Sequence, residues 1–487
     1  MSNFYVTTAI AYVNGEPHLG HAMEFVIGDA IARYMRQHGT PVIFATGTDE
    51  HGGKIAEKAD ELGITPQKLA DTVSLQFKDL MDSLNVSYDR FVRTTNPDHE
   101  KRAQIVWERL QPHIYKGHYE GWYCTGDEEF FSEEVVKANK GICPDHNRPY
   151  EKLTEENYFF KLSAFTEQIK KVIESDELQI LPQSRKNEIL AVLNKGLEDI
   201  SISRPKKKIS WGIPVPGDDT QVIYVWFEAL LNYITVLGYP EDEDFKKFWP
   251  ANIQVIGKGI LRFHAAIWPG ILMALGLPLQ KMLYVHGYIT VDGGKKMSKS
   301  LGNVVSPNEV IEKYSAETFR YFFLRHVPSY DDGDFSWQRL EAAYNNELAD
   351  QLGNAVSRTA AMIQKYQNGV IGDIPAPEHD LGSFEQALEQ CHFDRALDDI
   401  WEQVRGINQY VEETKPWELA KNKDDEHLRE VLAYMVGSLL QVAELLVPFM
   451  PETAEKIKGV FGSGMLNPLP GPLFPKAEKP KEAKSAK

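Results

Sequence analysis

Apolar side chains at the start of the chain change their spacing twice within 45 residues. Residues 3–9 form a continuous apolar run that predicts a strand. Residues 18–37 then carry apolar side chains at helical spacing, before Gly39 and a second apolar run at 41–45. A strand, a helix and a strand in this order favour a parallel sheet, because parallel strands need a crossover connection.

The alternation of strands and helices is interrupted in the middle of the chain and then resumes. Residues 117–217 are rich in charges and hold two of the three cysteines, which indicates an inserted module. The strand pattern returns at 221–225 and at 252–256, and helical spacing follows at 226–236 and 261–275. We therefore expect one parallel sheet that is split by an insertion.

The C-terminal part of the chain loses the strand pattern. A strand at 281–291 and a Gly- and Lys-rich loop at 292–303 precede a region that shows helical periodicity only, which is typical of a helical bundle. The predicted fold class is α/β, with a Rossmann-type parallel sheet, a connective insertion and an all-α bundle. The expected boundaries are 1–116 and 218–280 for the sheet domain, 117–217 for the insertion, 281–335 for the loop region, 336–470 for the bundle and 471–487 for a disordered basic tail.

Length and composition limit the class of protein. A chain of 487 residues is too long for one hydrophobic core, and it has no run of 18 or more apolar residues that would cross a membrane. The N-terminus lacks the basic start and apolar stretch of a secretory signal, so we expect a cytoplasmic protein. The net charge of −17 argues against non-specific nucleic-acid binding as the main role, although the RPKKK run at 204–208 supplies a local basic face.

The tetrapeptide His18-Leu19-Gly20-His21 lies where the first predicted strand gives way to the first helix. Ligands bind at this edge of open α/β sheets, and the N–H groups at a helix N-terminus favour phosphate. The two imidazoles, three residues apart, share a helix face and can donate to phosphate oxygens. Gly20 leaves room for an adenine to lie on the backbone. The simpler alternative is a pair of capping or surface histidines.

The pentapeptide KMSKS at 296–300 lies in a loop bounded by glycines at 293, 294 and 302. The ammonium of Lys299 can reach the α- and γ-phosphates of ATP and stabilise the departing pyrophosphate, since such stabilisation needs a cation placed at the developing charge. A solvated surface turn is the alternative for any lysine-rich loop.

The two motifs, in this order and context, resemble those of the class I aminoacyl-tRNA synthetases. The resemblance implies that ATP is bound with Mg²⁺. It implies that the catalytic residues are His18, His21, Lys296 and Lys299. The ATP contacts that it implies are His18, Gly20, His21, Gly257, Lys258 and Lys299.

The chain resembles the methionyl-tRNA synthetases from residue 4 to about residue 451. The matching motifs include TTAIAYVNGEPHLGH, ATGTDEHGGKI, YVWFEALLNY, IGKGILRFHAAIWPG and HGYITVDGGKKMSKSLGN. This resemblance implies that L-methionine is activated with ATP to methionyl-adenylate and transferred to the 3′-terminal adenosine of tRNA(Met), with release of pyrophosphate and AMP. The methionine contacts that it implies are Ala9, Ile10, Tyr12, Trp226, Ala229, Leu230, Tyr233, Ile260, Phe263 and His264.

The residue types of this implied pocket suit methionine. A thioether is polarizable and prefers aromatic neighbours, which Trp226, Tyr233 and Phe263 provide. Tyr12 and His264 can direct weak polar contacts at the sulfur. Taken one at a time, each aromatic residue is equally well explained by core packing.

The resemblance also assigns charged contacts around the substrate. Asp49 matches the acidic residue that binds the substrate ammonium, and Arg204 matches the arginine that pairs with that aspartate. Lys258 matches a lysine near the ATP. Gly259 stands where the family often has an acidic residue, so we assign it no contact with the ribose.

The insertion carries the spacing of a zinc knuckle, as in the relatives. The implied ligands are Cys124, Asp127, Cys143 and His146. Each pair has two intervening residues, which suits tetrahedral ligation, so Zn²⁺ is an expected cofactor. Asp127 replaces a family cysteine, and Glu128 and Asp145 are alternative ligands. A knuckle that is held by packing without metal is the other interpretation.

The helical bundle is expected to recognise the tRNA anticodon through Asn354, Arg358 and Trp417. Asparagine and arginine one helical turn apart can bond to base edges, and tryptophan can stack on a base. However, asparagine and arginine one helical turn apart are common on helices, and Trp417 could instead be a core residue.

Two other functions remain open from the sequence. Another class I synthetase is one, although the spacing from His21 to Lys296 is too short for the long editing insertion of the leucine, isoleucine and valine enzymes. A non-catalytic tRNA-binding relative is the other, and the intact motifs argue against it. We expect a monomer, because only a short tail follows the helical bundle.

Overall fold

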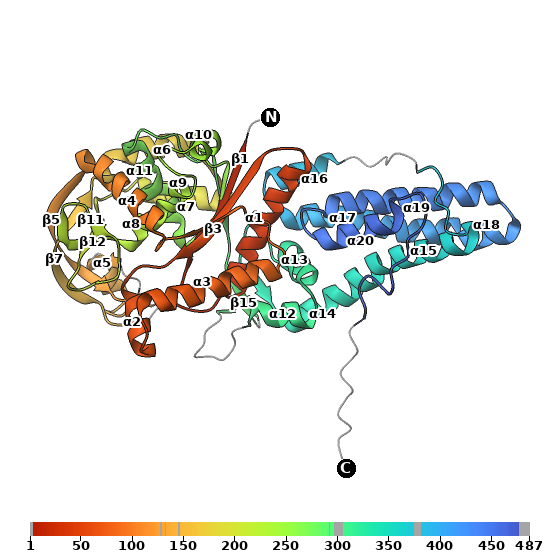
Figure 1. The fold of residues 1–487 in the computed structure, drawn as a ribbon, viewed down its shortest axis with the longest axis horizontal. Helices are drawn as coiled ribbons and strands as arrows, with labels where there is room; N and C mark the ends of the chain where they lie inside the picture. The colour runs from red at the N-terminus through yellow and green to blue at the C-terminus, as the bar shows by residue number, and fades with distance from the viewer. Residues whose placement is uncertain are drawn as a thin grey trace, which may run out of the picture. The chain divides into compact units, whose positions relative to one another are not determined.

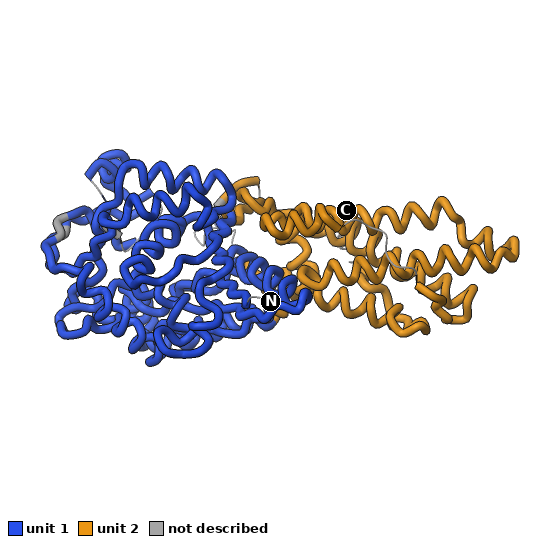
Figure 2. Tube along the Cα trace, turned by 90° about the horizontal axis from the view of Figure 1, so that it is seen from above, with its two compact units in different colours: residues 1–82, 86–286 blue, residues 83–85, 287–487 orange. Residues whose placement is uncertain are grey.

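The computed structural model describes residues 3–126, 129–131, 133–144, 147–291, 293–296, 305–374 and 381–476. The chain divides into two compact units, which Figure 2 shows in different colours: residues 1–82 with 86–286, and residues 83–85 with 287–487. Among the described residues, no helix combines the length and the apolar character that a membrane crossing requires.

The first unit is built on a seven-stranded sheet in the order β2-β3-β1-β13-β14-β8, with β4 paired to β3. Every pairing in this sheet is parallel, as the sequence predicts. The strands are β1 (Phe4–Thr8), β2 (Ala11–Tyr12), β3 (Val42–Asp49), β4 (Arg90–Arg93), β8 (Gln179–Leu181), β13 (Ile253–Gly257) and β14 (Met282–His286).

Helix α1 (Leu19–Gln37) packs against β1, β3 and β13, close to the range predicted from its apolar spacing. The approach is tight at Gly28, where a Cβ atom would lie 2.8 Å from the Phe44 ring and 2.9 Å from the Thr8 methyl group. A side chain there would push the helix off the sheet. Outside the inserted region, the other α-helices of this unit are α2 (Gly53–Leu62), α3 (Pro66–Ser83), α4 (Pro97–Arg109), α8 (Val225–Leu230), α9 (Asn232–Thr235), α10 (Glu243–Phe248) and α11 (Trp268–Ala274).

The inserted region is mainly antiparallel. One sheet has the order β6-β5-β7-β9, and a smaller one has the order β10-β12-β11. One strand inside the predicted insertion, β8, instead pairs with β14 in the main sheet, so the chain returns to that sheet between helices α6 and α7. The elements of the region are β5 (Ile114–Cys124), β6 (Glu129–Phe131), α5 (Glu133–Ala138), β7 (Glu151–Phe160), α6 (Thr166–Glu174), α7 (Gln183–Leu193), β9 (Ile200–Ser201), β10 (Ser203–Pro205), β11 (Pro214–Val215) and β12 (Asp218–Ile223).

The second unit begins with a small sheet in the order β16-β15-β17 and continues as a helical bundle, as the periodicity predicts. Helices α15, α17, α19 and α20 run side by side in it (Figure 1). The predicted strand at 281–291 is two strands, and the predicted helix at 340–366 contains a π-helical stretch, Tyr344–Gly353. The elements are β15 (Ile289–Val291), β16 (Lys295–Lys296), β17 (Gly333–Phe335), α12 (Pro307–Lys313), α13 (Ala316–Arg325), α14 (Trp337–Ala343), α15 (Asn354–Gln367), α16 (Gly382–Glu389), α17 (Phe393–Thr414), α18 (Pro416–Asn422), α19 (Asp425–Leu446) and α20 (Pro451–Phe461).

Candidate active site

The candidate site of the first unit lies at the carboxyl edge of the parallel sheet. Strands β1, β3, β13 and β14 end at Thr8, Asp49, Gly257 and His286, and because they are parallel these ends meet at one edge. The segments that continue from them carry most of the residues predicted to bind substrate. The fold therefore brings together positions that are more than 200 residues apart in the sequence.

His18 and His21 form a reciprocal cap at the start of α1. The His21 backbone N–H donates to His18 Nδ1, and the His18 N–H donates to His21 Nδ1, each over 3.3 Å. The rings stack with centroids 3.6 Å apart. A Cβ atom at Gly20 would lie 3.1 Å from the His18 ring, so a larger residue would require this ring to shift by a few tenths of an ångström. The two histidines therefore cap helix α1, and this arrangement is compatible with phosphate binding.

The cap also determines which ring nitrogens can act on a ligand. Because each Nδ1 accepts a backbone N–H, a neutral ring must carry its proton on Nε2. Loss of hydration lowers the pKa of His18 to about 4, although part of its ring stays open to solvent. Burial, together with the neighbouring His18 and His286, lowers the pKa of His21 well below its usual value. Both residues are neutral near pH 7 and offer Nε2–H donors.

The sequence analysis missed a connection between α1 and β14. His286 Nε2 lies 2.8 Å from Glu24 Oε2, and both side chains are largely buried. Glu24 lies on α1, less than one turn beyond His21, so this contact ties the start of the helix to the end of the strand. The sequence feature that could have indicated this contact is the position of His286 within a predicted strand.

Two aromatic rings form one wall of the predicted methionine pocket. Trp226, on α8, stacks on Phe263 with ring centroids 4.3 Å apart and planes 19° from parallel. Phe263 opens a π-helical turn, Phe263–Ile267, and such turns are frequent at functional sites. Ala229 and Leu230 lie buried on the same helix as Trp226.

Tyr233 and His264 support this wall from behind. Tyr233 Oη lies 2.6 Å from His264 Nε2, and His264 Nδ1 lies 2.9 Å from the Ile260 carbonyl oxygen. A carbonyl only accepts, so Nδ1 carries the proton and the tyrosine donates to Nε2. Burial lowers the pKa of His264 to about 4, so the ring is neutral. Both nitrogens are engaged within the protein, and we therefore revise the interpretation that His264 directs a polar contact at the sulfur.

The first strands supply the remaining predicted contacts. Ala9 and Ile10 follow β1, and the Ala9 N–H donates to the Val255 carbonyl over 3.0 Å. Tyr12, on β2, is the register partner of Asp49 on β3. Gly257 ends β13, and Lys258 and Ile260 belong to the short 3-10 turn that follows it.

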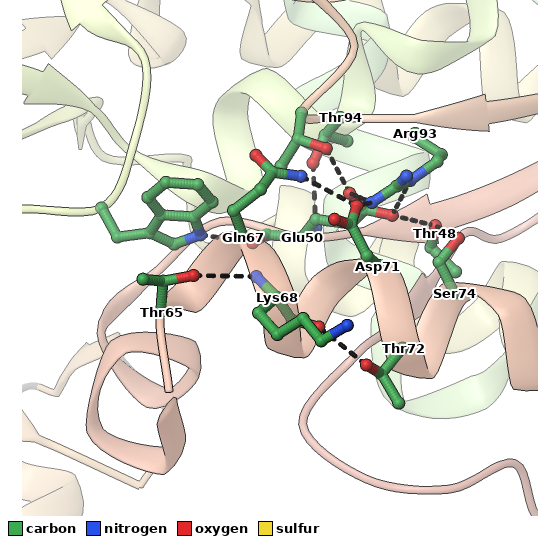
Figure 3. A network of polar contacts seen from close by, with 12 residues as sticks. Thr48, Glu50, Thr65, Gln67, Lys68, Asp71, Thr72, Ser74, Arg93 and Thr94 are labelled. Carbon is green, nitrogen blue, oxygen red and sulfur yellow. Dashed lines mark hydrogen bonds and ion pairs between the residues drawn. The ribbon is translucent and has the colours of Figure 1, made fainter. Parts of the chain in front are cut away.

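Two ionisable residues follow Asp49 directly in the chain. Asp49 is buried, and Glu50 and His51, the next two residues, are buried as well. Glu50 receives two hydrogen bonds from Arg93, as Figure 3 shows, and His51 Nδ1 lies 2.8 Å from the fully buried Glu228. The sequence analysis did not single out any of these partners.

Arg204 lies on β10. The sequence suggested that it belongs to a solvated basic run, but its side chain does not share the exposure of the lysines in that run. Its guanidinium donates to Ser201 Oγ and to the Ser203 carbonyl, both at 2.8 Å, and stacks 3.9 Å above the Tyr224 ring. Arg204 is buried, unlike the lysines that follow it. Its pairing with Asp49 stays a prediction.

The predicted zinc ligands are only partly within the described residues. Cys124 and Cys143 are buried in one small cluster with Val136 and Tyr150, so the fold brings the two predicted thiol ligands into the same part of the insertion. Asp127 and His146, and the alternatives Glu128 and Asp145, lie outside the described residues. Within the described ranges, no group of three or more metal-ligating side chains is gathered.

The lysine loop is described only at its base. The backbone of Lys296 belongs to β16, and Lys299 lies outside the described residues. The N–H groups of Gly293 and Gly294 donate to the Asp334 carboxylate at 3.2 and 2.9 Å, with both glycines at positive φ. This aspartate fixes the glycine turn that precedes KMSKS.

The predicted tRNA contacts lie in the helical unit. Asn354 is exposed at the start of α15, and Arg358, one turn later, forms a 2.8 Å ion pair with Glu412 on α17. Trp417 lies on α18, which begins two residues after α17 ends, and 38% of its surface is exposed. That exposure excludes a core role for Trp417.

Comparisons with known proteins agree with this geometry. The model of the family "tRNA synthetases class I (M)" matches residues 4–152 and 145–360. The methionine–tRNA ligase of Caldanaerobacter subterraneus is 44% identical over 93% of this chain and 73% of its own length. The methionine–tRNA ligase of Thermotoga maritima is 41% identical over 93% of this chain and 74% of its own length.

Solved structures give the same result. Mycobacterium tuberculosis methionyl-tRNA synthetase in complex with methionyl-adenylate superposes with a TM-score of 0.91 at 36% identity, covering 98% of this chain and 100% of that one. Its apo form superposes with a TM-score of 0.85 at 33% identity, covering 99% of each chain. The chain therefore belongs to the class I aminoacyl-tRNA synthetases, in the family of the methionine–tRNA ligases.

Proposed function

We propose that this chain activates L-methionine with ATP to methionyl-adenylate and transfers the methionyl group to the 3′-terminal adenosine of tRNA(Met). One observation carries the proposal: the histidine cap of α1, His18 with His21, lies at the same sheet edge as the stacked rings of Trp226 and Phe263. A relative with this fold binds the product of that first step, methionyl-adenylate.

In the first step a methionine carboxylate oxygen attacks the α-phosphorus of ATP, and the bond to the β-phosphate oxygen breaks to release pyrophosphate. The Nε2–H groups of His18 and His21 donate to phosphate oxygens as negative charge develops, and the N-terminus of α1 adds its dipole. Neutral donors suit this task because they bind the transition state without binding free phosphate as strongly as a cation would. Lys296 and Lys299 stabilise the leaving pyrophosphate. Mg²⁺ enters with ATP and neutralises phosphate charge.

Methionine selection rests on the shape and polarizability of the pocket. The thioether packs against Trp226 and Phe263, where sulfur–aromatic contacts are favourable. Asp49 binds the ammonium, which orients the carboxylate for attack. His264 and Tyr233 fix the pocket wall through their mutual hydrogen bond. Tyr12, Ala9 and Ile10 close the pocket from the strand side.

In the second step the 2′-hydroxyl of the terminal ribose attacks the carbonyl of the adenylate, and AMP leaves. Asn354, Arg358 and Trp417 select the tRNA by contacting anticodon bases. A few placed contacts of this kind are compatible with a net charge of −17, because recognition requires a local surface and not a basic protein.

Methionine-dependent exchange of pyrophosphate into ATP tests the proposal. Exchange with methionine, and none with leucine, isoleucine, valine or cysteine, is the expected result. Exchange with another of these amino acids would identify a different class I synthetase. A protein that binds tRNA(Met) without any exchange would be a non-catalytic relative.

The insertion is proposed to bind Zn²⁺ through Cys124, Asp127, Cys143 and His146, with Glu128 and Asp145 as alternatives to Asp127. Two buried thiols in one cluster support a metal that prefers thiolate. Metal analysis of the purified protein should find one equivalent of zinc, and the Cys143→Ala variant should lose it. Metal-free wild-type protein would end this proposal.

We further propose that the protein acts as a monomer in the cytoplasm. Sedimentation at micromolar concentration should give the mass of one chain, and a dimer would contradict this.

A further inference from the structure

Three consecutive ionisable residues, Asp49, Glu50 and His51, end strand β3 and begin the segment that leads to α2. All three are buried. Burying a charged side chain is costly unless it has a partner of opposite charge. The charged residues of this segment therefore require such partners from the surrounding elements. The structure provides these partners from different elements for Glu50 and for His51.

Glu50 is held by β4 and by its own strand. Arg93 donates to both carboxylate oxygens at 2.7 and 2.9 Å, and the Thr48 hydroxyl adds a bond of 2.6 Å. Arg93 also donates to Asp71 on α3 (Figure 3). The Glu50 carbonyl accepts from the Trp211 indole at 2.6 Å. Side chain and backbone of Glu50 are therefore fixed.

His51 is held on a different side, by helix α8. Its Nδ1 lies 2.8 Å from Glu228 Oε1, and its Nε2 lies 3.6 Å from Glu100 on α4. Burial alone would lower the pKa of His51, but the charge of Glu228, with Glu100 and Asp49, raises it to about 10. The ring is a cation at neutral pH, and it lies two residues after Asp49 in the same buried segment.

Glu228 joins this segment to the wall of the methionine pocket. Its second oxygen, Oε2, lies 2.9 Å from His99 Nε2, so one fully buried carboxylate accepts from two imidazoles. His99 in turn contacts the Thr235 hydroxyl through Nδ1 at 2.8 Å. Glu228 lies on α8 between Trp226 and Ala229, so its contacts fix that helix against β3 and α4.

We propose that Glu228 is a positioning residue for the ammonium subsite: by holding His51 and His99 it sets the orientation of Asp49 relative to the pocket wall on α8. The inference rests on the proposed role of Asp49. A carboxylate is required because it accepts at both oxygens. Glutamine has the same shape but turns an N–H₂ group toward one of the two imidazoles.

Competitive inhibition by two methionine fragments tests the proposal. Methioninol keeps the ammonium and the thioether, whereas 4-(methylthio)butanoate keeps the thioether and lacks the ammonium. Glu228→Gln should weaken methioninol by about 10-fold or more, the range for lost bonds to a charged group, and leave 4-(methylthio)butanoate within about twofold. Equal loss for both fragments would show that Glu228 only supports the side-chain pocket and would overturn the proposal.

A double variant adds a second criterion. If Glu228 acts through Asp49, the Asp49→Asn/Glu228→Gln protein should lose no more methioninol affinity than Asp49→Asn alone, and Glu228→Asp should recover part of the loss. Additive losses would contradict the proposal. The KM for ATP should change less than about twofold in Glu228→Gln, because the phosphate cap is unaltered.

Asp29→Asn is the matched control for lost stability. Asp29 is also fully buried, near the middle of α1, where it pairs with Arg33 at 2.7 Å and accepts from the Ser87 N–H at 2.7 Å. This variant should lower Tm like Glu228→Gln but keep methioninol affinity. If it weakens methioninol equally, the effect of Glu228 is one of general destabilisation and the proposal fails.

The outcomes separate the inference from the proposed function. Absence of methionine-dependent exchange in the wild type would refute the proposed function. Unchanged methioninol affinity in Asp49→Asn would refute the role of Asp49 and the inference with it. Loss in Asp49→Asn without loss in Glu228→Gln would refute the inference alone.

Discussion

In the first unit some of the residues assigned to chemistry, such as Asp49, Arg204 and His264, are buried, whereas in the helical unit the residues assigned to tRNA are exposed or partly exposed. Burial keeps His264 neutral and a buried carboxylate keeps His51 charged. Asn354 and Trp417 are exposed, and the ion pair of Arg358 is open to solvent. The function of a buried group depends on its protonation state and on its fixed position, whereas an exposed group acts by contacting its ligand directly.

This difference predicts separable defects. Changes in the first unit should alter methionine activation even when tRNA is absent. Changes on the helical surface should leave activation intact and weaken only the use of tRNA. The following predictions test that separation, beginning with the largest effect.

Replacing His18 by asparagine should give the largest loss. Asparagine is a good N-cap residue, so its side-chain oxygen keeps the bond from the His21 N–H and the helix stays capped. It lacks the Nε2–H donor, and loss of one transition-state donor costs about 10²–10³-fold in kcat. Pyrophosphate exchange should show this fall in kcat, with Tm unchanged. An unaltered kcat would show that His18 serves only as a cap.

Trp417→Ala should give the next largest effect, on tRNA alone. Stacking of a base on an aromatic side chain is worth about 1–3 kcal/mol, so kcat/KM for tRNA(Met) should fall about 10- to 100-fold. Methionine-dependent exchange without tRNA should match the wild type. Tyr434→Ala, another exposed aromatic of the same unit, is the control and should change neither activity. A loss of exchange in Trp417→Ala would break the separation between the units.

The buried state of His264 should be visible in the pH dependence of stability. Its pKa is about 4 in the folded protein against about 6.5 when unfolded, so the unfolded chain binds the extra proton between these values. Stability from this residue is complete above pH 6.5 and is lost as the pH falls toward 4. Between pH 7 and 5 the wild type should lose up to about 2 kcal/mol more than His264→Gln.

Denaturant titrations at the two pH values measure this difference. Tyr233→Phe is the matched control, because it removes the hydrogen-bond partner but keeps the buried imidazole. It should retain most of the pH slope. An equal slope in the wild type and in His264→Gln would mean that the ring is already protonated, or solvated, in the folded state.

The sequence predicted the elements that repeat a local pattern. Apolar spacing located α1 and the bundle helices, and the motif His18-Leu19-Gly20-His21 marked the start of α1. Periodicity could not show that β8 returns from the insertion to the main sheet, because a three-residue strand carries too little pattern. It also missed the π-helical stretch at Tyr344–Gly353, whose apolar spacing resembles that of an α-helix.

The candidate site was predictable only where residue type implied chemistry. Trp226 and Phe263 were named through family motifs, but Glu228 lies between named residues and was passed over. Its role depends on His51 and His99, which are far from it in sequence and reach it only after folding. A buried ion pair between residues far apart in the chain leaves no local pattern in the sequence. Each charged residue, taken alone, is most simply interpreted as exposed to solvent.

The smallest predicted effect concerns the ion pair between Arg358 and Glu412. Both side chains are partly exposed, so the pair contributes about 0–1 kcal/mol to stability. Glu412→Gln should leave Tm within about 2 °C for a protein of this size. It should also release the guanidinium for RNA and remove a negative charge from its path. We therefore expect the KM for tRNA(Met) to fall by about two- to fivefold, with a steeper dependence on salt.

Glu413→Gln, the next residue on α17, is the control because it bonds Gln409 and not Arg358, and it should leave KM nearly unchanged. A rise in KM for Glu412→Gln would mean that the carboxylate orients Arg358 for the base, in which case even this exposed contact is preorganised, as the buried ones of the first unit are.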